Sequence, residues 1–310
     1  MIGSLKVLDG GLFTTIQDTG RTGFRKYGIP ASGVMDAHAT KLANWLVGNP
    51  HETPVIEMTL QGASYQFQSD AVIGISGANM DARVNNQQIE RYKTQEIREG
   101  DTLSFSYAKS GCRAYLAIQG EWKVEEVLGS YSAYTMGGFG GKFGRIIKKN
   151  DVLEWDFEKQ ERGKREVPRK LLPYYSSSGN RIRIIAGQEW EVLSKENQKR
   201  FLGREYQISS ESNRMGMRLQ GEPLYFEGGE MVSSAVIPGI VQLPKQGNPI
   251  ILMQDGQTAG GYPRIAKVAD ADLWRIAQLA PNSTLAFNLI EMEEAKALSR
   301  YMKSLYELLG

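Results

Sequence analysis

Two segments of the sequence carry side chains that could bind a polar ligand, and the first spans residues 17–36. It reads QDTGRTGFRKYGIPASGVMD. Arg21 could grip a carboxylate or phosphate through two parallel hydrogen bonds. Ser32 stands beside a glycine in PASGVMD, and Asp36 stands where a helix is predicted to begin, so that free N–H groups there favour an anion. The alternative interpretation is structural: Asp36 only caps the helix, and Arg21 pairs with Asp18.

The second segment, QDGQTAGGYPRI, starts at Gln254 and directly follows an apolar run. Its polar side chains, Asp255, Gln257, Thr258 and Tyr262, stand among glycines at the end of a predicted strand, which is a common way to build a site. A decorated hairpin turn is the alternative. Because both segments open on Gln-Asp and pass through glycine, they are either unrelated turns or two loops that face one ligand.

The stretch SNRMGMRL places Arg214 and Arg218 four residues apart. If the stretch is extended, both side chains point to the same side, because their separation is even. They would then form either a clamp for an anion or a solvated pair.

The glycine-rich stretch MGGFGGKFG at 136–144 resembles a phosphate-binding loop only superficially. A Walker A loop needs glycine where Met136 stands, and it needs Ser or Thr after the lysine, where this chain has Phe143. The stretch therefore predicts a loop over a site and not a nucleotide phosphate loop.

Composition excludes several classes of function. A formal charge of +2 over 310 residues gives no electrostatic case for nucleic acid or an anionic membrane as a partner. Cys112 is the single cysteine, and the alternating run around it favours a buried structural thiol over a nucleophile. With only His38 and His51, no metal site and no Ser-His-Asp triad is predicted. The start of the chain lacks a signal-peptide pattern, and no apolar run spans about 20 residues, so we expect a cytoplasmic protein.

These side chains need a framework, and the first half of the chain predicts mainly strands. Short apolar or alternating runs flanked by Gly, Asp or Asn stand at 63–68, 71–76, 102–107 and 113–118. One helix interrupts them: Asp36 can cap it, its apolar face is Ala39, Leu42, Ala43 and Leu46, and Gly48 ends it.

A charged stretch followed by prolines and serines, 158–180, predicts a boundary between two domains. Strands are expected beyond it at 181–187, 206–209, 217–219, 231–237, 249–254 and 284–290, with helices at 190–202 and 270–279. A terminal amphipathic helix has Ala295, Leu298, Met302, Leu305 and Leu309 on one side. We therefore expect two β-rich domains, 1–165 and 180–310, with one glycine-rich segment in each.

Taken together, the motifs resemble one family, allophanate hydrolase subunit 2, also called the biotin-dependent carboxyltransferase family, which includes KipA-like proteins and the C-type subunit of 5-oxoprolinase. The resemblance rests on five stretches in fixed order: TTIQDTGRTGFRKYGIPASGVMD, LANWLVGN, NRMGMRL, VIPGIVQLP and QDGQTAGGYPRIA. It covers nearly the whole chain, and the stretch around 136–144 also matches the family.

The resemblance implies a mainly β chain built of two cyclophilin-like β-barrel domains. It also implies a component of an ATP-dependent 5-oxoprolinase that opens the pyroglutamate lactam to glutamate. The implied partners are a KipI-like protein, which is the B-type subunit, and an A-type subunit of the lactam-utilisation kind. ATP would be used by the complex, the isolated chain would be inactive, and no cofactor is assigned to this chain. Two alternatives stay open: a regulatory protein that antagonises a KipI-like inhibitor of a sensor kinase, or a module that carboxylates urea-like amides from carboxybiotin on another chain.

On this basis one cleft is predicted, lined from both domains. Asp255 and Tyr262 are the predicted catalytic residues. The predicted substrate-binding residues are Arg21, Ser32, Asp36, Arg214, Gln242, Gln257 and Thr258.

Several positions depart from the pattern of the family that the chain resembles. Gly256 stands where an arginine is usual and Tyr131 where another is usual, while Asn213 and Ser234 replace carboxylates. These changes imply either a substrate other than 5-oxoproline or positions that serve structure alone.

Overall fold

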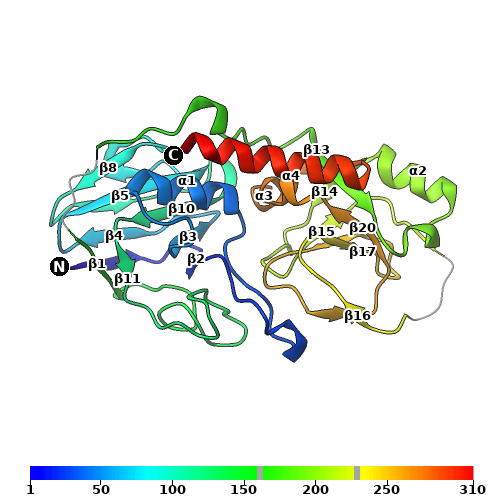
Figure 1. The fold of residues 1–310 in the computed structure, drawn as a ribbon, viewed down its shortest axis with the longest axis horizontal. Coiled ribbons are helices and arrows are strands. Elements are labelled where there is room, and N and C mark those ends of the chain that lie inside the picture. Colours follow the sequence, from blue (N-terminus) through cyan, green and yellow to red (C-terminus); the bar gives the residue numbers. More distant parts are fainter. Residues whose placement is uncertain (159–162, 227–230, 310) are drawn as a thin grey trace. The chain divides into compact units, whose positions relative to one another are not determined.

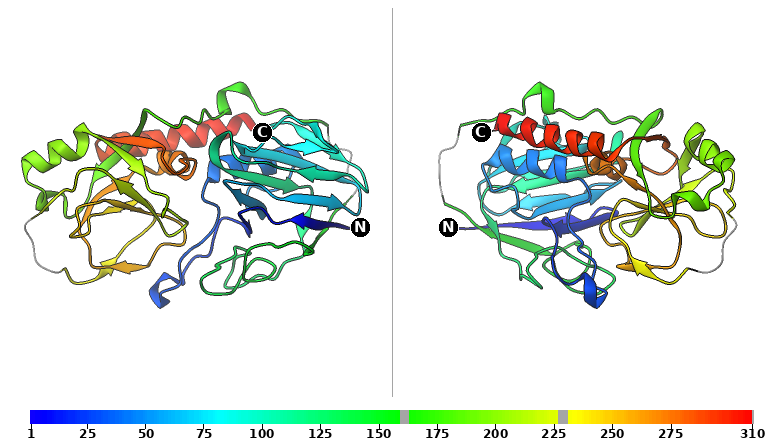
Figure 2. Two further views of the ribbon diagram at one scale, coloured as in Figure 1. Left: turned by 180° about the vertical axis from the view of Figure 1, so that it is seen from behind. Right: turned by 45° about the vertical axis from the view of Figure 1, so that its right-hand side comes forward.

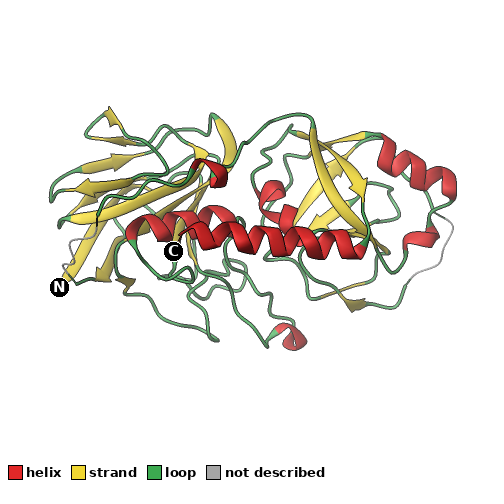
Figure 3. Cartoon of the chain, turned by 45° about the horizontal axis from the view of Figure 1, so that its top comes forward, coloured by secondary structure: helices red, strands yellow, loops and turns green. Residues whose placement is uncertain are grey.

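The computed structural model describes residues 1–158, 163–226 and 231–309, and these form two compact units (Figure 1). Unit 1 comprises Met1–Thr22, Ser32–Tyr175 and Leu309, and unit 2 comprises Gly23–Ala31 and Ser176–Leu308. Strands and loops dominate both units (Figure 3), which confirms the prediction of a mainly β chain with a few helices. Of the predicted boundary segment, residues 159–162 lie outside the described residues.

Unit 1 contains two antiparallel sheets, of seven and five strands. The first has the order β11 (Glu121–Trp122), β12 (Val152–Asp156), β1 (Ile2–Asp9), β4 (Ser64–Phe67), β9 (Thr102–Ser104), β6 (Arg83–Val84) and β7 (Gln87–Gln88). The second has the order β2 (Phe13–Gln17), β3 (Val55–Thr59), β10 (Ser110–Ile118), β5 (Ala71–Asn79) and β8 (Thr94–Ile97).

The two sheets of unit 1 enclose one apolar core. Leu5 and Phe67 enter it from the first sheet, and Ile56 and Leu116 enter it from the second. The other side of the second sheet is also covered, by helix α1 (Ala37–Val47), which packs on β5 and β10 (Figure 2). Strand β10 is consequently buried on both sides, and this explains its nearly continuous apolar sequence.

Helix α1 has the limits that its capping residues predict. The Asp36 carboxylate accepts a hydrogen bond from the N–H of Ala39 at 2.8 Å. Gly48 ends the helix in the left-handed conformation, at φ 71°. The predicted apolar face is buried. Helix α1 therefore fixes the position of the segment that precedes it, residues 32–36.

Unit 2 is a closed barrel of seven strands. Their order is β13 (Asn180–Ala186), β20 (Arg264–Val268), β17 (Ile240–Gln242), β18 (Ile250–Leu252), β15 (Gly216–Gln220), β14 (Glu205–Ile208) and β21 (Thr284–Leu289). Strands β13 and β21 run parallel, and the other neighbours are antiparallel. A separate pair, β16 (Ser234–Ala235) and β19 (Ala259–Gly260), carries part of the second predicted segment.

The helices of unit 2 are α2 (Lys195–Gly203), α3 (Leu273–Ala277) and α4 (Met292–Tyr306). Three short 3-10 turns also belong to unit 2: η1 (Arg25–Tyr27), η3 (Trp190–Val192) and η4 (Asp270–Asp272). The turn η2 (Arg169–Leu171) lies in unit 1, and η5 (Glu307–Leu309) ends at Leu309, which is assigned to unit 1. Phe201 of α2 stacks on Phe287 of β21 with ring centroids 4.8 Å apart.

Most predicted elements exist with shifted limits. The helix predicted at 190–202 is split into η3 and α2, because Ser194 caps a new helix by accepting from the N–H of Asn197. The strand predicted at 231–237 is reduced to β16. Strands β17 and β20 were not predicted, because β17 has only three residues and follows Pro238-Gly239, and β20 follows Pro263 directly.

Candidate functional site

Asp18 organises the part of the first segment that belongs to unit 1, whereas residues 23–31 belong to unit 2. Its carboxylate accepts hydrogen bonds from Ser130 Oγ at 2.7 Å, from the N–H of Tyr131 at 2.7 Å and from the N–H of Gly20 at 2.8 Å. Ser132 Oγ also donates to it. Four donors from two distant stretches thus converge on one buried carboxylate, which ties residues 130–132 to the turn after β2.

Arg21 is held in the same assembly. Its side chain is buried, and its Nη2 donates to the carbonyl of Ser132 at 2.5 Å. The guanidinium lies 5.0 Å from the centre of the Phe139 ring, a cation–π contact. A Cβ at Gly140 would lie 2.1 Å from the Ser132 carbonyl oxygen, so only glycine fits there. Arg21 therefore anchors the glycine-rich stretch, and its contact with a ligand carboxylate stays a prediction.

Ser32 combines two unusual features. Its backbone is left-handed at φ 55°, a conformation that costs a non-glycine residue about 1–2 kcal/mol. Its hydroxyl is buried and has no hydrogen-bond partner among the residues that the structure describes. Strain and unpaired polar atoms concentrate at functional sites, which keeps Ser32 a candidate.

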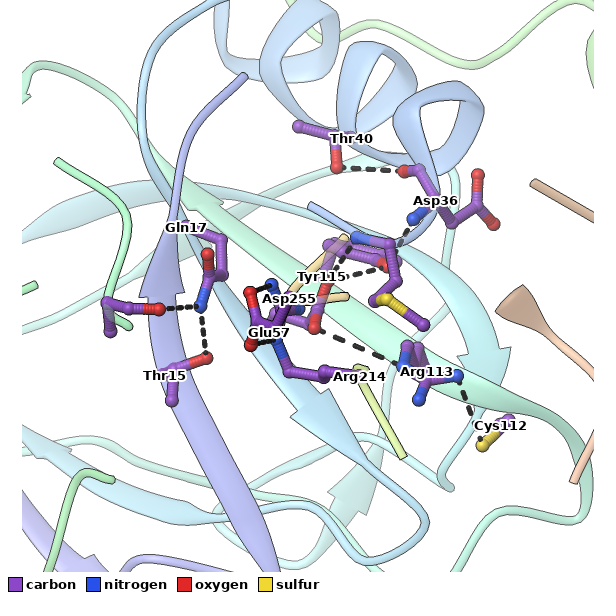
Figure 4. A network of polar contacts seen from close by, with 12 residues as sticks. Thr15, Gln17, Asp36, Thr40, Glu57, Cys112, Arg113, Tyr115, Arg214 and Asp255 are labelled. Carbon is purple, nitrogen blue, oxygen red and sulfur yellow. Dashed lines mark hydrogen bonds and ion pairs between the residues drawn. The ribbon is translucent and has the colours of Figure 1, made fainter. Parts of the chain in front are cut away.

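Asp36 and the residue before it are held by a polar network that the sequence reasoning missed (Figure 4). The N–H of Asp36 donates to Tyr115 Oη at 2.8 Å, and Tyr115 Oη donates to Glu57 at 2.9 Å. Glu57 also accepts from the N–H of Met35 at 2.8 Å, and Arg113 Nε lies 4.0 Å from it. Burial raises the pKa of Tyr115 well above its usual value, and the Glu57 and Asp36 carboxylates raise it further.

One sequence signal could have revealed this network. Glu57 is the single charged residue in the apolar strand VIEMT. Arg113 and Tyr115, two residues apart, are the polar side chains of the otherwise apolar run RAYLAI. Cross-strand pairing places Tyr115 opposite Glu57, so their side chains share the face that α1 covers. Cys112, as predicted, is buried; burial raises the pKa of its thiol.

In unit 2, Arg214 and Asp255 form a buried ion pair (Figure 4). Arg214 Nε and Nη2 donate to the two carboxylate oxygens of Asp255, at 2.8 and 3.2 Å. The condition for Arg214 and Arg218 to share one side, an extended stretch through both residues, is not met. Strand β15 begins only at Gly216, so Arg214 lies in the preceding turn and is buried, whereas Arg218 is exposed.

Two predicted glutamines also meet in unit 2. Gln257 Nε2 donates to Gln242 Oε1 at 3.3 Å. The carbonyl oxygen of Thr258 accepts a hydrogen bond from the N–H of Val236 at 3.1 Å. Tyr262 is 45% exposed, so its side chain lies at the surface of the unit. The second segment therefore carries a buried ion pair, an amide pair and an exposed phenol.

The departures have structural counterparts in unit 2. A Cβ at Gly256 would lie 2.8 Å from the carbonyl oxygen of Met253 and 2.9 Å from that of Met215, so the backbone leaves no room for an arginine there. Asn213 accepts from the N–H of Met215 at 2.8 Å, a hydrogen bond that a carboxylate could also accept. The backbone therefore excludes a side chain at residue 256, and Asn213 stabilises the turn before β15.

The structure thus brings together Arg21 with Ser132 in unit 1, and Arg214 with Asp255 and Gln242 with Gln257 in unit 2. That the two sets line one cleft stays a prediction. Within the described ranges, no group of three or more His, Cys, Asp or Glu side chains could hold a metal ion. No helix in those ranges is both long and apolar enough to cross a membrane.

Comparison with known proteins identifies the family. A family model described as "Carboxyltransferase domain, subdomain A and B" matches residues 27–289. The chain is 36% identical over 307 residues to the C-type subunit of 5-oxoprolinase from Escherichia coli (strain K12), covering 99% of this chain and 97% of that protein. The chain belongs to this carboxyltransferase family.

Longer proteins contain the same module. Urea amidolyase of Saccharomyces cerevisiae (strain ATCC 204508 / S288c) is 34% identical over 305 residues, which is 93% of this chain and 17% of that protein. The crystal structure of the Kluyveromyces lactis urea carboxylase matches with a TM-score of 0.92 and 31% identity, over 99% of this chain and 29% of that one. The chain therefore corresponds to only one part of those longer enzymes.

Proposed function

We propose that this chain is one component of an ATP-dependent amide hydrolase that opens the lactam of 5-oxoproline. Its proposed partners are a KipI-like B-type subunit and an A-type subunit of the lactam-utilisation kind. The observation that carries the proposal is the match to the C-type subunit of the Escherichia coli 5-oxoprolinase, which extends over nearly the full length of both chains. A relative named as a subunit favours a role inside a complex, so we propose that the isolated chain is inactive.

The chemistry of unit 2 supports a planar amide as the ligand. Ring opening adds water to the lactam carbonyl carbon and breaks the C–N bond, which leaves a carboxylate and an amine. Gln242 and Gln257 offer neutral amide groups, and Tyr262 offers an exposed hydroxyl that could hold or move a proton. We propose that ATP is consumed by the complex, and we assign no residue of this chain to it.

Co-expression tests the proposal. The chain is produced with the B-type and A-type proteins of its own source, the complex is purified, and glutamate formed from 5-oxoproline is measured with and without ATP. We expect ATP-dependent glutamate formation that disappears when this chain alone is omitted. A complex that forms cleanly and hydrolyses no 5-oxoproline would rule out this substrate.

A second candidate is carboxyl transfer from carboxybiotin on another chain to a urea-like amide. The observation in its favour is the TM-score of 0.92 to the Kluyveromyces lactis urea carboxylase over 99% of this chain. Here the carboxyl group leaves the ring nitrogen of carboxybiotin and forms a bond to the amide nitrogen, and the proton that the amide nitrogen loses goes to the biotin ring nitrogen. Transfer of label from bicarbonate to urea, blocked by avidin, would select carboxyl transfer over lactam hydrolysis.

A further inference from the structure

Gln242 places a polar side chain on the outer surface of the barrel wall of unit 2. Its neighbour Val241 pairs with Ile251, and both side chains are buried in the barrel. In the regular pairing with β18, successive side chains of β17 point to opposite faces, which places Gln242 on the outer face; the register with β20 shifts between Val241 and Gln242. Gln242 is nevertheless only 1% exposed, because the β16–β19 pair lies over it.

The hydrogen bonds of this amide are incomplete. Gln242 Oε1 accepts a hydrogen bond from Gln257 Nε2 at 3.3 Å. This contact orients the Gln242 amide, and the Nε2 of Gln242 takes no part in it. In the part of the chain that the structure describes, no group accepts a hydrogen bond from this Nε2. Buried donors are nearly always paired in folded proteins, so an unpaired one needs an explanation, and an acceptor from outside the chain is one.

Gly260 lies against both amides. A Cβ at this position would lie 2.5 Å from Gln257 Nε2 and 2.6 Å from Gln242 Nε2, closer than real Cβ atoms approach. Since the φ of Gly260 is not positive, the requirement for glycine is one of space and not of backbone conformation. A side chain at residue 260 would occupy the space beside the two amide nitrogens, so glycine keeps the two amides in contact.

We infer that Gln242 and Gln257 form a recognition site for a planar amide or ureido group. Gln242 Nε2 donates to the ligand carbonyl oxygen, and the exposed Gln257 side chain presents its Oε1 to a ligand N–H. Both side chains are neutral, so the pair selects a group that is donor and acceptor at once, in preference to a bare carboxylate. The choice of ligand class rests on the proposed function of this chain. The inference adds which residues of unit 2 bind the amide group.

A matched pair of small lactams tests this inference on the full chain. The probe 2-pyrrolidinone has both the carbonyl and the N–H, and N-methyl-2-pyrrolidinone lacks the N–H. Titrations are followed through the side-chain amide resonances of protein labelled with 15N at glutamine. We expect 2-pyrrolidinone to shift the Gln242 Nε2 signal, and N-methyl-2-pyrrolidinone to bind at least threefold more weakly.

The variants separate recognition from folding. Gln242→Glu replaces the donor with a charged acceptor and is expected to weaken 2-pyrrolidinone binding at least tenfold. Gln257→Ala changes an exposed side chain, so it keeps the fold and should remove the preference between the two lactams. Gln207→Glu, at an exposed position of β14, makes the same chemical change elsewhere on the barrel and should leave binding unaltered.

Unchanged lactam binding by folded Gln242→Glu, or by Gln257→Ala with its preference intact, would overturn the inference. So would a titration of the unaltered protein that leaves the Gln242 signal unmoved. The proposed function fails separately: a complex that does not open 5-oxoproline, while 2-pyrrolidinone still shifts Gln242, refutes the substrate and supports the amide site.

Discussion

Tyr65 buries its whole side chain in the apolar core of unit 1, where its hydroxyl has no hydrogen-bond partner among the described residues. Burial raises the pKa of this phenol far above its usual value. Because an unpaired buried hydroxyl costs about 1–3 kcal/mol, we expect Tyr65→Phe to raise the free energy of unfolding by about 1 kcal/mol. Urea unfolding followed by circular dichroism measures it.

Tyr206 provides the matched control in unit 2. Its hydroxyl accepts from Arg204 Nε at 2.9 Å, and burial raises its pKa to about 12. Tyr206→Phe therefore breaks a hydrogen bond to a charged group and should lower the free energy of unfolding by about 1.5–3 kcal/mol. Equal effects of the two substitutions would show that the Tyr65 hydroxyl is paired in solution.

The Arg214–Asp255 pair makes a second prediction at the scale of residues. Both side chains are about 6% exposed, so Asp255→Asn removes a negative charge that accepts two hydrogen bonds from a buried guanidinium. We expect Asp255→Asn to lower the free energy of unfolding by about 3–5 kcal/mol, measured by urea unfolding.

The double variant Arg214→Met with Asp255→Leu should be more stable than Asp255→Asn alone, because it removes both charges of this buried pair. If Asp255→Asn matched the unaltered protein in stability, the buried-pair description would be wrong. The same pair explains why a loss of activity in an Asp255 variant would not by itself prove a catalytic role.

At the scale of elements, the pair Glu189–Arg264 joins the segment after β13 to strand β20. Arg264 donates to Glu189 through Nε at 2.9 Å and through Nη2 at 2.5 Å, and the Arg264 N–H donates at 2.9 Å. The hydrogen bonds from the Arg264 side chain lower the pKa of Glu189 from its usual 4.5, with further lowering by its N–H and charge. A lowered pKa stabilises the fold above about pH 4.5, and this contribution is lost as the pH falls through the folded-state pKa.

We therefore expect Glu189→Gln to lower the free energy of unfolding at pH 7 by about 1.5–3 kcal/mol, and the difference to vanish as the pH falls below the lowered pKa of Glu189. Denaturant unfolding at a series of pH values measures it. Glu211→Gln is the control, because Glu211 is exposed and lies 3.8 Å from Arg218. A pH-independent difference for Glu189→Gln would mean that the ionised carboxylate is not what stabilises this contact.

At the scale of the whole molecule, the enzymatic and regulatory alternatives differ in what the exposed side chains do. If the chain acts in catalysis, Tyr262→Phe removes a hydroxyl that could transfer a proton and should lower turnover by the complex about 100-fold. Binding of the partner proteins should not change. ATP-dependent glutamate formation and co-purification of the partners measure the two properties separately.

Tyr225→Phe is the matched control, since Tyr225 is an exposed tyrosine of the same unit, 67% exposed. Full turnover by the Tyr262→Phe complex would remove Tyr262 from the catalytic residues. Intact partner binding and intact control of a sensor kinase, with no turnover of any amide, would favour the regulatory alternative.

How much of the fold the sequence predicts depends on how local each signal is. The limits of α1 follow from Asp36 and Gly48, which act within one helical turn, and β5 and β10 follow from their own apolar runs. The gaps are equally specific. β17 was missed because three residues are too few to show a periodic pattern, and Glu57 was passed over because its partner Tyr115 is 58 residues away.

The sequence by itself determined the family, the mainly β composition and the residue types available for a site, because motifs in fixed order and short-range periodicity are properties of the chain. Only the tertiary structure decided the partners of those residues. Asp18 meets Ser130 across 112 positions and Arg214 meets Asp255 across 41. Pairings of this range depend on strand order and register, which no local pattern encodes. That is why Arg21 emerged as an anchor of the glycine-rich stretch and Gln242 as a buried donor in the wall of a barrel.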